Sequence, residues 1–226
     1  MHLEPPNSRL ESFRDFARHY LMIVLSILTA LGLEAWIEHV HHAHAAAVAN
    51  AQIEAELGAN LADIRKMRDA DVQRLRALNQ LDGYLIQAVK DGTDAATIRQ
   101  HVDALTKGQI YLGLLLPEMR HEAWDVAVAN QSASWIDAAR LRDYSAVYAA
   151  QDAMTRLIMM DAPSIYDGPR MQDTLLDVRT GDYQPRDLLH VVNQMCAAAS
   201  EATHGLQALA QRIHVAVPDL AQIAAR

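Results

Sequence analysis

Four histidines in the N-terminal quarter of the chain are the residues with the clearest potential for chemistry. They are His39, His41, His42 and His44. On a helix, His39 and His42 share one face, and His41 and His44 share another. Neutral imidazoles bind zinc, copper or nickel, but a zinc site needs three or four converging ligands. One helix offers too few ligands per face, so a metal site or a proton sensor here needs a second chain or helix. We therefore favour a polar collar at a membrane interface and assign no metal.

The other polar residues form no recognised catalytic motif. Ser132, Ser134 and His121 lack the arrangement of a nucleophile elbow, and the chain contains no glycine-rich phosphate-binding loop. A calcium loop needs oxygen ligands at alternate positions. Four aspartates lack that spacing, and we place them in a solvated loop: Asp161, Asp167, Asp173 and Asp177. The remaining histidines considered are scattered, as surface or hydrogen-bonded core residues are: His101, His121, His190, His204 and His214. We expect no catalytic residues, no cofactor and no enzyme activity.

Four aromatic residues and the single cysteine are expected to pack. Trp124, Trp135, Tyr144 and Tyr148 recur at helical spacings, which favours a place in the core. An aromatic ligand pocket is the alternative. Cys196 has no second cysteine with which to form an intrachain disulfide, and a lone cysteine in an alanine-rich helix usually packs as a small apolar residue.

The element that positions the four histidines is the apolar stretch Tyr20–Ile37, YLMIVLSILTALGLEAWI. A membrane-spanning helix needs about 20 mainly apolar residues, and this stretch comes close to that length. Tyr20 and Trp36 stand near its ends, where aromatic belts lie, and Glu34 is near enough to the end to reach the interface. We favour a transmembrane helix at 20–37. A buried soluble helix and a signal peptide cleaved after Gly32 are the alternatives.

The basic residues predict the orientation of this helix. Arg9, Arg14 and Arg18 precede the apolar stretch, and the next basic residue is Arg65. The positive-inside rule then places segment 1–19 in the cytoplasm and residues 38–226 outside. We expect a single-pass protein of the bacterial inner membrane with a periplasmic domain, which contacts the lipid bilayer through Tyr20–Ile37.

Composition predicts an all-α domain that does not bind nucleic acid. Half of the residues are hydrophobic, many of them alanine, and the chain of 226 residues has few glycines and prolines. The formal net charge of −8 leaves no basic face for phosphates. About 185 residues remain outside the membrane, enough for one domain with its own core.

Apolar periodicity divides this domain into helices. We expect a long helix at 38–91 continuous with the transmembrane helix, a short helix at 94–107, a helical pair at 118–162 that ends before Pro163, and a final helix at 185–214. A short helix is expected at 171–178, and 110–116 is read as helix or loop. One stripe lies on the first helix: Leu57, Leu61, Ile64, Val72, Leu75, Leu78, Leu81 and Leu85. It is expected to pack antiparallel against the final helix, Leu188–Ile213, in a bundle that buries Leu75 and Trp124.

The segment MIVLSILTALGLEAWIEH resembles the N-terminal anchor of a bacterial family of single-span membrane proteins of unknown function. The family pattern is an "IVLGILIAL" span followed by Trp and Glu, with Ser26 standing here at the glycine position. Ala123-Trp124 and the segment Tyr148–Gln151 form a second point of likeness. The resemblance implies a membrane-anchored helical domain and brings no known activity.

These observations favour a membrane-anchored periplasmic module that binds a partner protein or forms a homo-oligomer. A sensory, ligand-binding helical bundle is the alternative, and with fewer than about 20 residues on the cytoplasmic side it needs a partner subunit to signal.

Overall fold

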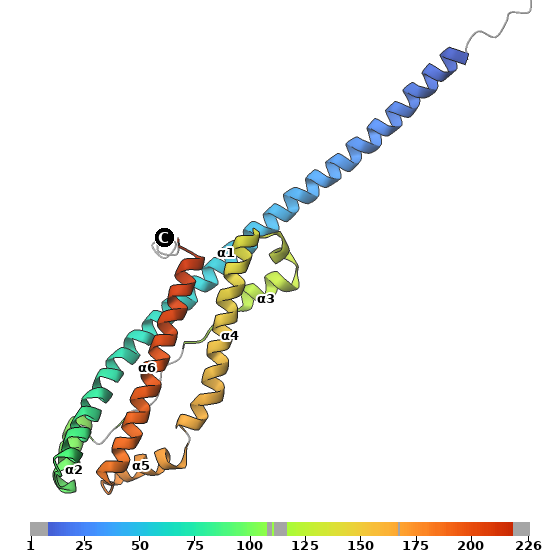
Figure 1. The fold of residues 1–226 in the computed structure, drawn as a ribbon. Helices are drawn as coiled ribbons and strands as arrows, with labels where there is room; N and C mark the ends of the chain where they lie inside the picture. Colours follow the sequence, from blue (N-terminus) through green and yellow to red (C-terminus); the bar gives the residue numbers. More distant parts are fainter. Residues whose placement is uncertain (1–8, 108–109, 111–116, 167, 219–226) are drawn as a thin grey trace, which may run out of the picture.

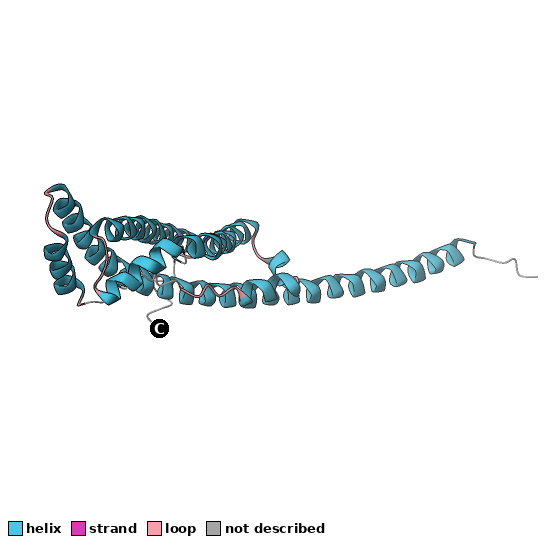
Figure 2. Cartoon of the chain, turned by 90° about the horizontal axis from the view of Figure 1, so that it is seen from below, coloured by secondary structure: helices cyan, strands magenta, loops and turns pink. Residues whose placement is uncertain are grey.

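The chain is all-α, as its composition predicts. The computed structural model describes residues 9–107, 110, 117–166 and 168–218, and for residues 9–12 and 157–166 it describes the backbone alone. Within this part of the chain there are helices and loops and no strand (Figure 2). The helices are α1 (Arg9–Lys90), α2 (Ala95–Thr106), α3 (Glu122–Ala129), the short 3-10 helix η1 (Ser132–Trp135), α4 (Ala138–Tyr166), α5 (Pro169–Thr180) and α6 (Pro185–Ala216).

Helix α1 is continuous over 82 residues, so it is about 120 Å long at 1.5 Å per residue. Its first part projects from the molecule, and its second part is a wall of the bundle (Figure 1). The projecting part is apolar and exposed. Among the described residues, α1 is the one helix long and apolar enough to cross a membrane. It ends as expected at Asp91-Gly92, where Gly92 takes a left-handed φ of 66°.

Helices α1 and α6 pack side by side and antiparallel, as the apolar stripe predicts (Figure 1). Nearest the projecting part of α1, one core joins the two helices to α3, η1 and α4, and Ile53 and Leu57 share it with Leu206 and Ile213. Tyr144 and Tyr148 of α4 are buried in the same core.

Two smaller cores lie at the far end of the α1–α6 pair. In one, Leu81 and Leu85 of α1 pack with Leu188 and Val192 of α6 and with Ile98 of α2. In the other, side chains of α1, α5 and α6 pack together: Leu78, Met171, Val191 and Met195. Helices α2 and α5 therefore close the end of the bundle farthest from the projecting part of α1 (Figure 1).

The buried face of α1 follows a repeat of seven residues. Fully or nearly buried side chains recur at this interval: Leu57, Ile64, Asp71, Leu78 and Leu85. Leu75 lies beside this repeat and is mostly but not fully buried, as predicted. Val72 is also partly exposed, and the other six leucines and isoleucines of the predicted stripe are buried.

Two of the predicted helix starts are confirmed by their caps. Asp94 caps α2, since its carboxylate accepts hydrogen bonds from the backbone N–H groups of Ala96 and Thr97. Helix α6 begins at Pro185, where the fixed φ of proline suits the first helical turn and its missing N–H costs no hydrogen bond. It ends at Ala216, two residues beyond the expected end.

The predicted helical pair at 118–162 differs from the structure at both ends. Helix α3 begins only at Glu122, because the backbone N–H and C=O of Arg120 are both hydrogen-bonded to the side chain of Asn60. Helix α4 does not end before Pro163 but continues to Tyr166, although a proline removes one backbone hydrogen bond from the helix. The turn comes at Gly168, and α5 starts at Pro169 rather than at Met171.

One prediction falls on a part of the chain that lies outside the described residues. It concerns the apolar run 110–116, of which only residue 110 is described.

Replacing Leu57 by alanine should destabilise the bundle far more than the same change at Leu105. Leu57 is fully buried in the core between α1 and α6, and truncation of a buried leucine costs about 2–5 kcal/mol. Leu105 is 50% exposed, so Leu105→Ala should stay within about 0.5 kcal/mol. Urea unfolding of the full chain in detergent, followed by circular dichroism, measures both. Equal effects would contradict the α1–α6 seam.

Candidate functional site

Asn60 fixes the segment that leads into α3. It is fully buried on the seam of α1, and its amide makes a pair of hydrogen bonds with the backbone of Arg120. Asn60 Nδ2 donates to the Arg120 carbonyl at 2.7 Å, and the Arg120 N–H donates to Asn60 Oδ1 at 3.1 Å. The Arg120 guanidinium also pairs with Asp63 at 3.1 Å. A buried amide satisfied in this way sets both the position and the direction of the chain that it binds.

Two glutamates on the same part of α1 bind α3 and α4. Tyr148 donates to Glu56 Oε1 at 2.6 Å, and the N–H of Ala123 donates to Glu56 Oε2 at 2.8 Å. Tyr144 donates to Glu54 Oε1 at 3.0 Å, where Arg140 is also bonded at 3.1 Å. Hydrogen bonds to a charged acceptor are stronger than neutral ones, so these contacts hold α3 and α4 firmly against α1.

The two tyrosine hydroxyls are neutral donors at physiological pH. Burial and the negative charge of Glu54 raise the pKa of Tyr144 to about 12. Burial, the hydrogen bond to Glu56 and the charge of Glu56 raise the pKa of Tyr148 further. Because folding favours the protonated hydroxyls, the contribution of these hydrogen bonds to stability is complete below pH 10 and falls as the pH rises above that value.

Trp124 lies on this tyrosine–glutamate network. Its ring stacks on Tyr148 with the centroids 5.1 Å apart and the planes at 21°. Most of its surface is covered, as predicted, and it packs against the core without being fully buried. The free part of the indole forms a wall of two hollows in the surface.

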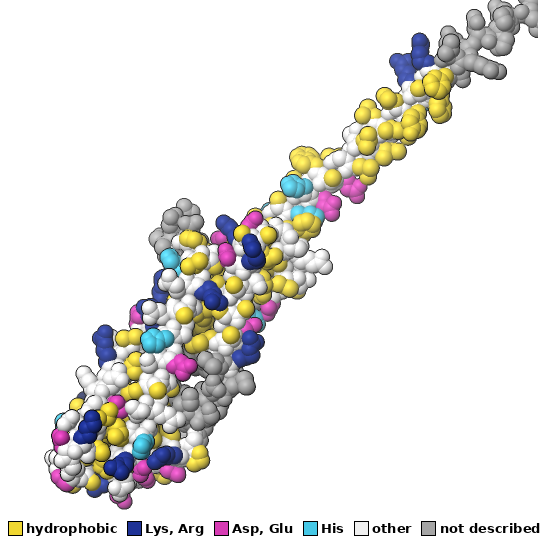
Figure 3. Space-filling view, viewed as in Figure 1, with side chains coloured by type: hydrophobic (Ala, Val, Ile, Leu, Met, Phe, Trp, Pro, Cys, Tyr) yellow, Lys and Arg dark blue, Asp and Glu magenta, His cyan; other side chains and the backbone are white. Residues whose placement is uncertain are grey.

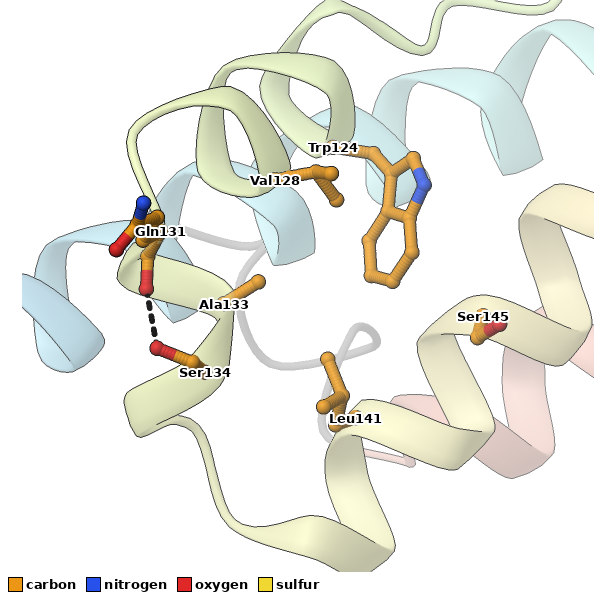
Figure 4. Close-up of a pocket in the computed structure, with 7 residues that line it drawn as sticks. All are labelled: Trp124, Val128, Gln131, Ala133, Ser134, Leu141 and Ser145. Carbon is orange, nitrogen blue, oxygen red and sulfur yellow. Dashed lines mark hydrogen bonds between the residues drawn. The ribbon is translucent and has the colours of Figure 1, made fainter.

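The larger hollow, called here the apolar hollow, has a volume of about 490 Å³. It lies between α3, η1 and α4 and is lined by Trp124, Val128, Gln131, Ala133, Ser134, Leu141 and Ser145. In Figure 4 the side chains of Trp124, Val128 and Leu141 border the same space. At its rim Ser134 donates to the carbonyl of Gln131 at 2.6 Å, and Gln131 has a left-handed φ of 64° that turns the chain from α3 into η1. An apolar space of this size with a few polar groups is typical of a binding pocket.

A second hollow shares Trp124 and Ser145 with the first and is called here the acidic hollow. Its volume is about 280 Å³, and it is lined by His121, Trp124, Asp125, Ser145, Tyr148, Ala149 and Asp152. His121 Nδ1 lies 2.6 Å from Asp125 Oδ2. The hydrogen bond with Asp125 and the charges of Asp125, Glu122 and Asp152 raise the pKa of His121. The carboxylate of Asp152, beside the Asp125–His121 pair and the ring of Trp124, suits a small organic cation.

The four histidines near the projecting part of α1 do not converge. His39, His41 and His44 are exposed, whereas His42 is partly covered by the indole of Trp135. Among the described residues, no group of three or more histidine, cysteine or acidic side chains is arranged to hold a metal ion. In Figure 3 histidines and acidic side chains follow the apolar part of α1, at the boundary where the bundle begins.

The other residues singled out in the sequence are dispersed. Asp173 and Asp177 lie within α5 and Asp161 lies within α4, so the solvated aspartate loop is not observed; Asp167 is outside the described residues. Ser132 is buried and donates to the carbonyl of Ala127 at 3.4 Å. Ser134 borders the apolar hollow and His121 borders the acidic hollow, so the two side chains do not line the same hollow.

Cys196 and Trp135 have opposite surroundings. Burial and the charge of Asp82 raise the pKa of the Cys196 thiol to about 11, which keeps it protonated and poorly nucleophilic. Trp135 was expected in the core, but 50% of its side chain is exposed.

The polar contacts that build this site could not be predicted from the spacing of residues in the sequence. Glu54, Glu56 and Asn60 read as ordinary polar residues on a long amphipathic helix, and their partners are 60 to 92 residues away in the chain. The one available signal was Asn60 itself, a polar residue on the apolar face.

Removing the hydroxyl of Tyr148 should destabilise the chain more than removing that of Tyr144. Tyr148→Phe leaves Glu56 Oε1 without its described donor, and loss of a hydrogen bond to a charged group costs about 1.5–3 kcal/mol. After Tyr144→Phe, Glu54 keeps its bond to Arg140, so the cost should be about 0.5–1.5 kcal/mol. Urea unfolding at pH 7 compares the two variants. A larger loss for Tyr144→Phe would refute the role given to Glu56.

Comparison of the chain with protein families, curated proteins and solved structures finds no match. The resemblance of the anchor to a bacterial single-span family therefore stays a prediction.

Proposed function

We propose that this chain is a membrane-anchored protein-interaction module of the bacterial inner membrane. Its projecting helix spans the bilayer, and its periplasmic helical domain binds an apolar segment of a partner protein in the apolar hollow. The alternative partner for the same hollow is a second copy of the chain.

Exposure of the projecting part of α1 supports the membrane anchor. Fourteen large apolar side chains from Phe13 to Val40 are 48–69% exposed, among them Leu21, Leu31 and Trp36. A continuous apolar surface of this extent is unfavourable in water and is stabilised inside a bilayer. The basic residues supply the orientation, because Arg14 and Arg18 precede the apolar stretch and Arg65 is the next basic residue.

The apolar hollow is the observation that carries the proposed binding function. It is open to solvent at Val128, which is 52% exposed, and it is backed by a firmly bonded wall formed by Trp124 on Tyr148. Interfaces obtain much of their affinity from an apolar or aromatic side chain placed in such a preformed hollow. No residue of the lining has the nucleophile–base geometry of catalysis, so the hollow suits binding.

The acidic hollow favours a second candidate function, a sensory bundle that binds a small organic cation and signals through a partner subunit. Asp125 and Asp152 supply negative charge, and Trp124 and Tyr148 supply aromatic faces. Under this alternative, spermidine or choline raises the melting temperature of the wild-type chain and leaves that of Asp152→Asn unchanged.

A photo-crosslinking amino acid at Val128 tests the protein-interaction function. In living cells we expect an adduct from Val128, which borders the apolar hollow, and none from the matched position Leu176, which is 53% exposed on α5. An adduct of twice the chain mass identifies a second copy, and any other mass identifies a different protein. Absence of an adduct at Val128, or equal labelling at Leu176, would contradict the proposal.

Reporter fusions test the proposed orientation. A reporter that is active only in the periplasm should be active when fused after Arg226, and one that is active only in the cytoplasm should be active when fused before Met1. The reverse pattern would overturn the orientation while leaving the anchor intact.

A further inference from the structure

Where η1 contacts α1, the exposed side chain of Trp135 lies beside the apolar part of α1. The rings of Trp135 and His42 are stacked, with centroids 3.4 Å apart and planes at 10°. Ala133 and Ile136, on either side of Trp135 in the chain, are buried in the same core as Ala46. The backbone of η1 is therefore held by the core, while half of the indole of Trp135 stays exposed.

The height of this pair above the apolar stretch follows from the geometry of α1. His42 is five residues beyond Ile37 on one continuous helix, which places it about 7.5 Å farther along the axis. The headgroup region on each side of a bilayer is about 5–8 Å thick, because the full thickness of about 40–45 Å includes a hydrocarbon core of about 30 Å. When Tyr20–Ile37 spans the hydrocarbon core, Trp135 lies at the level of the lipid headgroups.

We infer that Trp135 inserts into the headgroup layer of the outer leaflet and fixes the orientation of the helical domain on the membrane. This inference rests on the proposed anchor. The partner of the exposed Trp135 ring is the phospholipid surface. The apolar stretch that enters the bilayer and the residue on which Trp135 is stacked belong to one continuous helix. Tryptophan prefers this layer, where its ring contacts acyl chains and its N–H remains near water.

A second lipid contact beside α1 has a mechanical consequence. A single membrane helix tilts by about 20° on average and is free to turn about its own axis. Trp135 belongs to η1 and lies to one side of α1, so its insertion opposes both motions. The domain then presents the apolar hollow at a fixed height and in a fixed direction relative to the membrane surface.

The three tryptophans of the chain lie at three heights and serve as internal probes. Trp36 is at the end of the apolar stretch and is 65% exposed. Trp124 is far from the bilayer, because the adjacent Ala123 is bonded to Glu56, nineteen residues or about 28 Å beyond Ile37. Trp135, stacked on His42, lies between them.

Quenching by lipids that carry a nitroxide on the headgroup tests the inference in the full chain reconstituted into phosphatidylcholine vesicles. Three variants each keep one tryptophan and replace the other two by phenylalanine. We expect Trp135 to be quenched within about twofold of Trp36 and at least threefold more strongly than Trp124, as a ratio of intensities with and without the nitroxide lipid.

The outcomes separate this inference from the anchor on which it depends. Quenching of Trp36 without quenching of Trp135 would overturn the inference and leave the anchor standing; the same result is expected if a second copy or another protein covers Trp135. No quenching of either residue would refute the anchor as well. Equal quenching of Trp124 and Trp135 would show a domain lying flat on the surface, which also overturns the inferred orientation.

A nitroxide attached to the protein provides a measurement that needs no tryptophan substitution. The label is attached at a single cysteine, introduced as Ser134→Cys or as Leu105→Cys. Ser134 is exposed and adjacent to Trp135, and Leu105 is exposed on α2 at the far end of the bundle. Both variants are made in the Cys196→Ala background. The label at Ser134 should be at least threefold less accessible to a water-soluble nickel complex in vesicles than in detergent, and the label at Leu105 should not change. An unchanged accessibility at Ser134 would contradict the lipid contact.

Discussion

The antiparallel seam between α1 and α6 is the interaction on which the rest of the structure depends. It holds together three cores along the bundle, since leucines of α1 pack against apolar residues of α6 at both ends of the pair. Burial of each such side chain contributes about 1.5–3 kcal/mol, and the contact of α1 with α6 is the most extensive between any two helices of the described chain. Because α1 also carries the exposed apolar stretch, the same helix serves the bundle and the proposed membrane anchor.

Polar residues of α1 decide where the shorter helices attach. Asn60, Glu54 and Glu56 occupy neighbouring turns of α1, and each is bonded to a group in the segment from Arg120 to Tyr148. Asp71, fully buried one heptad beyond Ile64, accepts from Arg74 at 3.1 Å. A buried polar group left unsatisfied costs about 1–3 kcal/mol, so Asn60 and the two glutamates penalise any other register of α3 and α4 on α1, whereas the bond of Asp71 stays within α1.

Sequence reasoning predicted what depends on neighbours in the chain. The course of α1, the short helix that follows Asp94 and the start of α6 at Pro185 all follow from local spacing and local hydrogen bonds. The errors concern partners far away in the chain. Helix α3 begins late because Asn60 binds the backbone of Arg120, and Trp135 is exposed because η1 is held by its neighbours Ala133 and Ile136.

Of the candidate site, only the aromatic residues could be predicted from the sequence. The polar contacts that complete it join residues far apart in the chain. Trp124 and Tyr148 recur at helical spacings, and an aromatic pocket was an alternative to packing. Periodicity cannot show that one tyrosine is buried with its hydroxyl on Glu56 while the indole stacked on it stays partly open. That distinction depends on Glu56, which lies 92 residues away from Tyr148 in the chain.

The shortest helix links the two proposed contacts of the domain. Ala133 and Ser134 line the apolar hollow, and Trp135, the next residue, stacks on His42 at the proposed membrane level. A helix of four residues is too short to bend within itself, so a displacement of Trp135 moves the wall of the hollow with it. Under the proposed function, the lipid contact and the partner-binding hollow are therefore mechanically coupled. Membrane insertion of Trp135 restrains the wall to which a partner binds, which lowers the entropy that binding must remove.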